Sequence, residues 1–178
     1  MTKHCQSGFC IPYSVRETID KGRGVIADSS VSKDTIIYCN LLDQFKVYDE
    51  CSLKKHLASL DRQDAIYELT HMFGLPNFPE HVIRFLDDGV LINHSSEPNI
   101  ALNSHAGDDT KLCKTLPIDK ADVEYALLNI RYGLIAISDI KVGDELTMNY
   151  QDFTEDPSFY NDLCDQYGVS ESYLDWDG

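Results

Sequence analysis

The sequence predicts an α+β, β-rich protein. Strand-like runs occupy the first 40 residues and recur after residue 124, a helical stretch lies between them, and one more helix follows near the end. Strands that flank a helical segment are typical of α+β folds, whereas a regular strand–helix alternation would indicate a parallel sheet. With 178 residues, the chain has the length of a single domain.

The first predicted element is a strand–turn–strand over residues 14–27. Gly22 and Gly24 mark the turn region, because glycine is the residue that most readily adopts tight-turn conformations. A second turn at residues 32–34 precedes residues 35–38, a β-branched and aromatic run typical of a strand.

The middle of the chain predicts a helical insert over about residues 52–88. Asp61 can cap a helix that ends at Gly74. The apolar face of this helix is expected to contain Ile66, Leu69, Met72 and Phe73. Residues 79–86 predict a shorter helix, which begins at a proline and ends at an Asp-Asp-Gly turn.

The last third predicts strands again and then a helix. Residues 90–92 form a short apolar run directly before Asn93, residues 125–130 and 134–137 have the pattern of a hairpin, and residues 145–150 predict a final strand. A helix is expected over residues 157–168, with Gly168 at its end.

The charge of the chain disfavours direct nucleic-acid binding. Its net charge is −15, so its field repels phosphate backbones and favours a cationic partner. Residues 151–178 carry eight acidic residues and no basic one. Six of the 18 aromatic residues also lie there, which predicts a packed segment because disordered tails are poor in aromatics.

The six cysteines include no C-x-x-C pair, so the sequence predicts free thiols rather than a metal centre. We find no apolar run that predicts a membrane span, and the first residues do not resemble a signal peptide. The expectation is an intracellular protein without membrane contact, in the cytoplasm or the nucleus.

Three short segments carry candidate chemistry, and each is weak alone. Gly22–Ala27 has a G-x-G pattern that a plain hairpin also explains. In 93–99, an Asn-His pair follows a buried-looking strand, where polar side chains need partners; an ordinary turn is the alternative. In 143–150, the carboxylates suggest a solvated turn, and Tyr150 could simply pack at a strand end.

In combination, these segments closely resemble the SET-domain protein methyltransferases. The resemblance rests on Gly22–Ala27, Leu91–Asn99 and Ala136–Tyr150 in this order and spacing. It implies a SET domain over residues 12–152 and a C-terminal helical flank over residues 153–178.

The family's fold consists of small β-sheets with a pseudoknot, in which the Asn-His segment runs beside the closing strand. The resemblance therefore implies such a fold, with a helical insert and a C-terminal capping helix.

The resemblance also implies a cofactor and a reaction. S-adenosyl-L-methionine would be bound by Lys21, Arg23, Gly24, Asn93, His94 and Tyr150. Tyr150 would be the catalytic residue, standing where the methyl donor meets the side-chain amine of a substrate lysine. The partner would be a basic protein or peptide, such as a histone.

This chain departs from the common family pattern in several places. It lacks the flanking cysteine-rich zinc segments, so another segment must close the lysine channel; we expect the aromatic helix at 157–168 to do so. Leu102 lies where some members have a channel tyrosine, which leaves the number of transferred methyl groups open. Candidate channel residues are Tyr38, Tyr132, Tyr160 and Trp176, although Tyr38 and Tyr132 are also compatible with ordinary strand or turn positions.

Two main functions stay open at this point. The first is an S-adenosylmethionine-dependent protein-lysine N-methyltransferase, and the second is a catalytically silent SET-like module that binds basic peptides through its acidic surface. Asn93, His94 and Tyr150 favour the enzyme, because a pure binding module has no need for all three. The acidic segment after Tyr150 is expected to frame the entrance for the substrate lysine.

Overall fold

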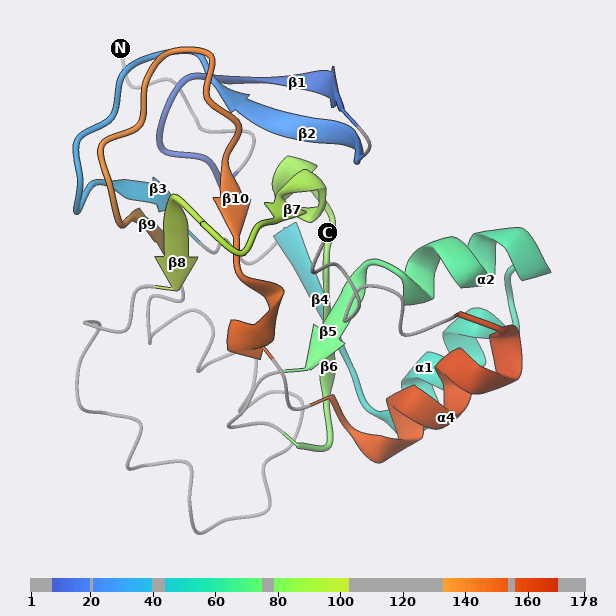
Figure 1. Ribbon diagram of the computed structural model, residues 1–178. Helices are drawn as coiled ribbons and strands as arrows, with labels where there is room; N and C mark the ends of the chain where they lie inside the picture. Colours follow the sequence, from blue (N-terminus) through green and yellow to red (C-terminus); the bar gives the residue numbers. More distant parts are fainter. Residues whose placement is uncertain are drawn as a thin grey trace, which may run out of the picture.

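A computed structural model describes residues 8–19, 21–39, 44–74, 79–102, 133–153 and 156–169. Its many short strands and few helices confirm the α+β, β-rich class (Figure 1). The strands are β1 (Tyr13–Thr18), β2 (Gly22–Ala27), β3 (Ile36–Tyr38), β4 (Phe45–Tyr48), β5 (Met72–Gly74), β6 (Val82–Phe85), β7 (Asn93–His94), β8 (Ile100–Leu102), β9 (Leu134–Ala136) and β10 (Thr147–Met148). The helices are α1 (Glu50–Leu57), α2 (Arg62–Leu69) and α4 (Ser158–Tyr167), with the 3-10 turns η2 (Asp88–Leu91) and η4 (Tyr150–Phe153).

Strands β1 and β2 form the predicted antiparallel hairpin. Its pairs run from Tyr13↔Ala27 to Thr18↔Gly22. Gly22 has a φ of 70°, a left-handed conformation that costs glycine little and allows the tight turn. The amide of Leu146 donates to the Val25 carbonyl at 2.7 Å, so β2 is also tied to the segment that enters β10.

A second sheet has the order β3-β9-β8, with both pairs antiparallel. Together with β2 it encloses the larger hydrophobic core. The side chains with no exposed surface in this core are Val25, Ala27, Ile37, Ile100, Ala136 and Leu146. The predicted strands at 35–38 and 134–137 are therefore confirmed, and the strand expected at 125–130 lies outside the described residues.

Strands β7 and β10 are short, parallel neighbours. Thr147 pairs with Asn93, and Met148 pairs with His94. The closing segment thus runs beside the Asn-His segment, as the resemblance implied. The regular strand is shorter than the predicted 145–150, because β10 covers only two residues and η4 begins at Tyr150.

The insert is only partly helical, so the expectation of helices throughout residues 52–88 is wrong. Helices α1 and α2 are present, each capped by an aspartate, Asp49 and Asp61. The second half of the insert instead contributes β5 and β6 to a sheet of order β4-β6-β5, whose strand β4 precedes the insert. The predicted helix at 79–86 is replaced by β6. Four consecutive residues from His81 to Arg84 are buried. Such a continuous run does not distinguish a central strand from a helix.

Two neighbouring predictions are also corrected. Helix α2 ends at Leu69 rather than Gly74, and Met72 and Phe73 belong to β5. Residues 90–92 do not form a strand, because the Asp87 carboxylate accepts a hydrogen bond from the Gly89 amide and begins η2. The η2 turn packs against β2, the strand that forms the glycine segment.

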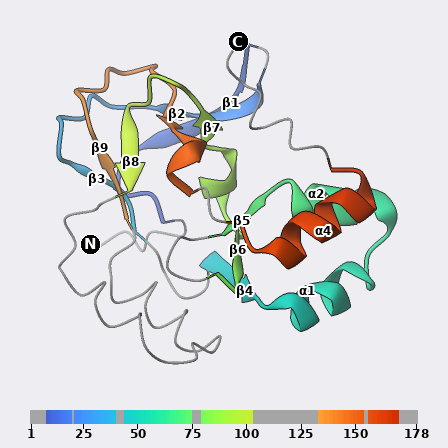
Figure 2. The same ribbon diagram turned by 60° about the horizontal axis from the view of Figure 1, so that its bottom comes forward.

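Helix α4 confirms the predicted C-terminal helix and its Gly168 end, where φ is 73°. It packs against α2 in a second hydrophobic core, separate from the one between the sheets (Figure 2). Tyr160, Leu163 and Cys164 are its buried residues. No helix in the described part of the chain has both the length and the apolar character that a membrane crossing requires.

We predict that Leu163→Ala lowers the free energy of unfolding by about 2–5 kcal/mol, because it leaves a cavity where a 4% exposed side chain joins α4 to the insert. Chemical denaturation would measure the change. Asp162→Ala, at an exposed position of the same helix, is the matched control and should change the stability by less than about 0.5 kcal/mol. Equal effects of the two variants would contradict the packing role of α4.

Candidate active site

The Asn93 side chain joins the three motifs that lie far apart in the sequence. Its amide nitrogen donates to the Arg23 carbonyl at 3.2 Å and to the Glu145 carboxylate at 2.7 Å. One partner lies in the glycine segment and the other in the closing segment. Glu145 is half-buried by this contact, so the interpretation of that carboxylate as part of a solvated turn is wrong.

Gly24 lies where an added side chain would meet three neighbouring side chains. A Cβ atom at this position would be 2.4 Å from the Glu145 carboxylate, 2.7 Å from the Thr18 methyl group and 2.9 Å from the Asn93 amide nitrogen. A side chain here would force Glu145, Thr18 or Asn93 to move, a constraint that the G-x-G pattern alone does not reveal.

His94 is 7% exposed and is held from two directions. Its carbonyl accepts a hydrogen bond from the Lys21 ammonium at 2.7 Å, and its Nδ1 accepts one from the Tyr150 amide at 3.1 Å. An Nδ1 that accepts a hydrogen bond carries no proton, so the proton of the neutral ring is on Nε2. Lys21 and Tyr150 thus fix the segment that carries His94.

Tyr150 packs beside His94, with the two ring centroids 5.4 Å apart. Its hydroxyl donates to the Ile92 carbonyl at 2.7 Å. Burial, and to a lesser extent the negative charge of Glu145, raises the pKa of Tyr150 to about 12. The hydroxyl is therefore neutral near pH 7, with oxygen lone pairs that can still accept a hydrogen bond.

Asn99 is a site residue whose part the sequence did not reveal. Its side chain donates to the Glu145 carbonyl at 2.7 Å and accepts from the Thr147 amide at 3.0 Å. It thereby fixes the start of β10 and the backbone of Glu145. The signal available in the sequence was its place at the end of the polar segment 93–99.

The tyrosines considered for a substrate channel lie in two different places. Tyr38 is 1% exposed in the larger core, where its hydroxyl donates to Asp87 at 2.8 Å and burial raises its pKa strongly. Tyr160 is also 1% exposed, and its hydroxyl donates to the Leu69 and Met72 carbonyls within the helical core. Tyr132 and Trp176 lie outside the described residues, and channel roles for all four stay predictions.

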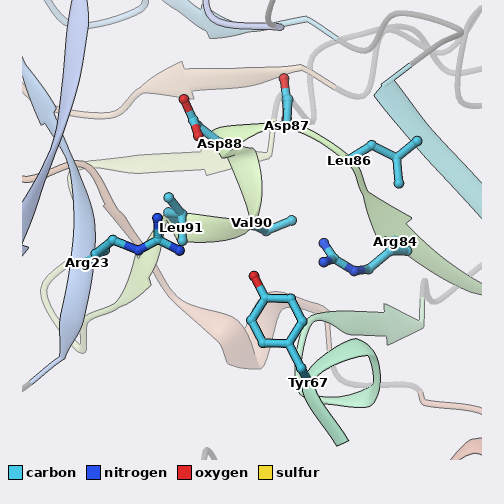
Figure 3. A pocket seen from close by; sticks show the side chains of 8 residues that line it. All are labelled: Arg23, Tyr67, Arg84, Leu86, Asp87, Asp88, Val90 and Leu91. Carbon is cyan, nitrogen blue, oxygen red and sulfur yellow. The ribbon is translucent and has the colours of Figure 1, made fainter. Parts of the chain in front are cut away.

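A cleft of about 200 Å³ opens beside the glycine segment, between β2, η2 and the insert (Figure 3). Arg23 belongs to the glycine segment, whereas Arg84 and Tyr67 come from the insert. The lining residues are Arg23, Tyr67, Arg84, Leu86, Asp87, Asp88, Val90 and Leu91. In the part of the chain that the structure describes, no three His, Cys, Asp or Glu side chains gather as they would around a metal ion.

Comparison with known proteins identifies the class that this fold and site define. The sequence model of the SET domain matches residues 22–151, which is most of the chain, so the protein belongs to the SET-domain family. This family consists in general of protein methyltransferases, and S-adenosylmethionine is their general cofactor. No curated protein sequence matches the chain significantly.

Among solved structures, the chain is similar to a candidate histone methyltransferase of Plasmodium falciparum. The two share 14% sequence identity, with a TM-score of 0.44 over 79% of this chain and 93% of the other.

We predict that Gly24→Ala destabilises the protein by about 1–3 kcal/mol, because the added methyl group displaces Asn93 or Glu145. Gly22→Asn is the control, since a Cβ at Gly22 meets nothing within 4 Å and asparagine tolerates its positive φ. Thermal denaturation of both variants would compare them. A Gly24→Ala variant as stable as Gly22→Asn would show that the contact is not tight.

Proposed function

We propose that this protein is an S-adenosylmethionine-dependent protein-lysine N-methyltransferase that acts on a lysine side chain of a basic protein. The observation that carries the proposal is the meeting of Asn93, His94 and Tyr150 beside the glycine strand. Family membership supports the same activity.

The residues present fit the proposed cofactor. Arg23 of the glycine segment presents its guanidinium to the neighbouring cleft, and its carbonyl is held by the Asn93 amide. The cofactor would be held by Lys21, Arg23, Gly24, Asn93, His94 and Tyr150. The first four would contact it mainly through backbone and amide groups. When bound, S-adenosylmethionine supplies a methyl group on a positively charged sulfur.

The properties of Tyr150 define its chemical role. A lysine amine attacks only after it has lost its proton, since its ammonium form has no lone pair. Tyr150 is neutral and has a raised pKa, so it does not remove that proton at neutral pH. Its hydroxyl hydrogen is donated to the Ile92 carbonyl, and its oxygen is free to accept an N–H of the amine. Tyr150 would therefore orient the amine for in-line attack at about 3 Å, and the proton would leave to water.

The charge of the chain favours a basic substrate. With 30 acidic against 15 basic residues, the protein attracts a lysine-rich segment and repels nucleic acid. Asp162 and Asp165 are exposed on α4, the helix nearest the C-terminus in the described part of the chain. We propose that this acidic surface helps to capture the substrate and that the protein acts inside the cell.

A catalytically silent SET-like module that binds basic peptides is the second candidate, and the same acidic charge favours it. Isothermal titration calorimetry with S-adenosylmethionine and a methyl-transfer assay on histone and ribosomal-protein mixtures separate the two. Cofactor binding with transfer to lysine supports the enzyme. Binding without transfer to any basic substrate would favour the silent module, and no binding would overturn the enzymatic proposal.

We predict that Tyr150→Phe lowers kcat by about 100-fold, because the amine loses the oxygen that orients it. Single-turnover assays with labelled S-adenosylmethionine would measure the chemical step. Tyr167→Phe is the matched control, since that tyrosine lies on α4 against Arg62 and away from the site. A Tyr150→Phe variant with unchanged kcat would exclude the orienting role.

We predict that kcat/KM rises with pH from 7 to 9 by up to about tenfold per pH unit. The reference pKa of lysine is about 10.4, so the neutral amine is scarce throughout this range. Tyr150 keeps its proton there because its pKa is about 12. The profile of Tyr150→Phe should have the same slope at a lower rate. A titration near neutral pH that disappears in this variant would instead identify Tyr150 as a base.

A further inference from the structure

The orientation of the Tyr150 hydroxyl depends on a backbone carbonyl at the end of a short turn. The hydroxyl donates to the Ile92 carbonyl at 2.7 Å, and Ile92 is the residue that ends η2. This bond fixes the direction of the hydroxyl hydrogen, and with it the direction of the lone pairs that the oxygen offers to an amine. The position of η2 therefore bears on the chemistry proposed for Tyr150.

The η2 turn is held by long hydrogen bonds of its own. The Ile92 amide donates to the Gly89 carbonyl at 3.4 Å, and the Val90 amide donates to the Asp87 carbonyl at 3.3 Å. Both distances exceed the usual range for such bonds, and the geometry of a 3-10 turn is poorer than that of an α-helix. The shape of η2 accordingly depends on contacts from other groups.

The Asp87 side chain provides such a contact at the start of the turn. Its Oδ1 accepts a hydrogen bond from the Gly89 amide at 3.0 Å and so caps η2. The same oxygen accepts from the Tyr38 hydroxyl at 2.8 Å, and Oδ2 accepts from the Gly8 amide at 2.9 Å. Hydrogen bonds to an ionised carboxylate are stronger than bonds between neutral groups. Because Tyr38 is buried in the larger core, the cap is anchored to a well-packed part of the protein.

We propose that Asp87 is a positioning residue for Tyr150, because it caps η2 and thereby fixes the Ile92 carbonyl that orients the hydroxyl. The inference rests on the proposed function. The connection runs from the Asp87 carboxylate to the Gly89 amide, from the Gly89 carbonyl to the Ile92 amide, and from the Ile92 carbonyl to Tyr150. Asp87 lies outside the three motifs and acts through Ile92 rather than on the reacting atoms.

The first test separates the cap from the other contacts of Asp87. Asp87→Ala removes every hydrogen bond of the carboxylate, whereas Asp87→Ser keeps one oxygen that can cap the turn. In single-turnover assays with saturating labelled S-adenosylmethionine, we expect Asp87→Ala to lower the rate of methyl transfer about tenfold and Asp87→Ser less than about twofold. Asp49→Ala is the matched control, since it removes the cap of α1, which accepts from the Ser52 amide at 2.7 Å. This control should keep the wild-type rate.

The second test asks whether the effect passes through Tyr150. In the Tyr150→Phe background, Asp87→Ala should lower the rate less than about twofold, because the hydroxyl that Ile92 orients is absent. A purely structural role would give the same loss in both backgrounds and would overturn the proposal, as would equal losses for Asp87→Ala and Asp87→Ser. If Asp87→Ala does not fold, Asp87→Glu decides with the same expectations, because glutamate keeps the charge but is not a preferred cap.

Failure of this inference is distinguishable from failure of the proposed function. A wild type that binds no S-adenosylmethionine or transfers no methyl group would overturn the proposed function and the positioning role with it. A wild type that transfers methyl groups, together with an Asp87→Ala variant of unchanged rate, would overturn only the role of Asp87.

Discussion

The hydrogen bonds of the Asn93 side chain are the contact on which the site depends. They connect β7 to the glycine strand 70 residues earlier and to Glu145, 52 residues later. Strands β7 and β10 pair over only two residues each. The Asn93 amide and the Asn99 side chain therefore supply much of the hydrogen bonding that holds the segments of these two parallel strands together. Gly24 belongs to the same arrangement, since a Cβ atom there would displace the Glu145 carboxylate, the Thr18 methyl group or the Asn93 amide.

The paired strands β7 and β10 hold His94 and Tyr150 in place, and the polar groups of both residues have hydrogen-bond partners. His94 is buried, yet its carbonyl and its Nδ1 both have donors, from Lys21 and from the Tyr150 backbone. Tyr150 is anchored through the Ile92 carbonyl while its oxygen keeps acceptor capacity. Satisfied polar groups of this kind stabilise one arrangement, because each alternative would leave a buried group without a partner.

The insert is a second structural unit with its own core, and it contributes to the cleft. Residues of α1, α2 and α4 pack together there, so the C-terminal helix supports the helix that carries Tyr67. The neighbouring β6 carries Arg84 as the middle strand of its sheet. A change in α4 can therefore affect the cleft through the insert, although α4 itself contributes none of the residues that line it.

The sequence by itself determined the α+β class, the β1–β2 hairpin, helix α4 and the three motifs, since these depend on local patterns of glycine, β-branched and apolar residues. It misplaced residues 79–86, because His81 to Arg84 are buried by neighbouring strands and such a run has no strand period. The roles of Glu145 and Asn99 depended on tertiary structure alone. Each acts on segments distant in sequence, and a side chain's type does not reveal which partner the fold will bring to it.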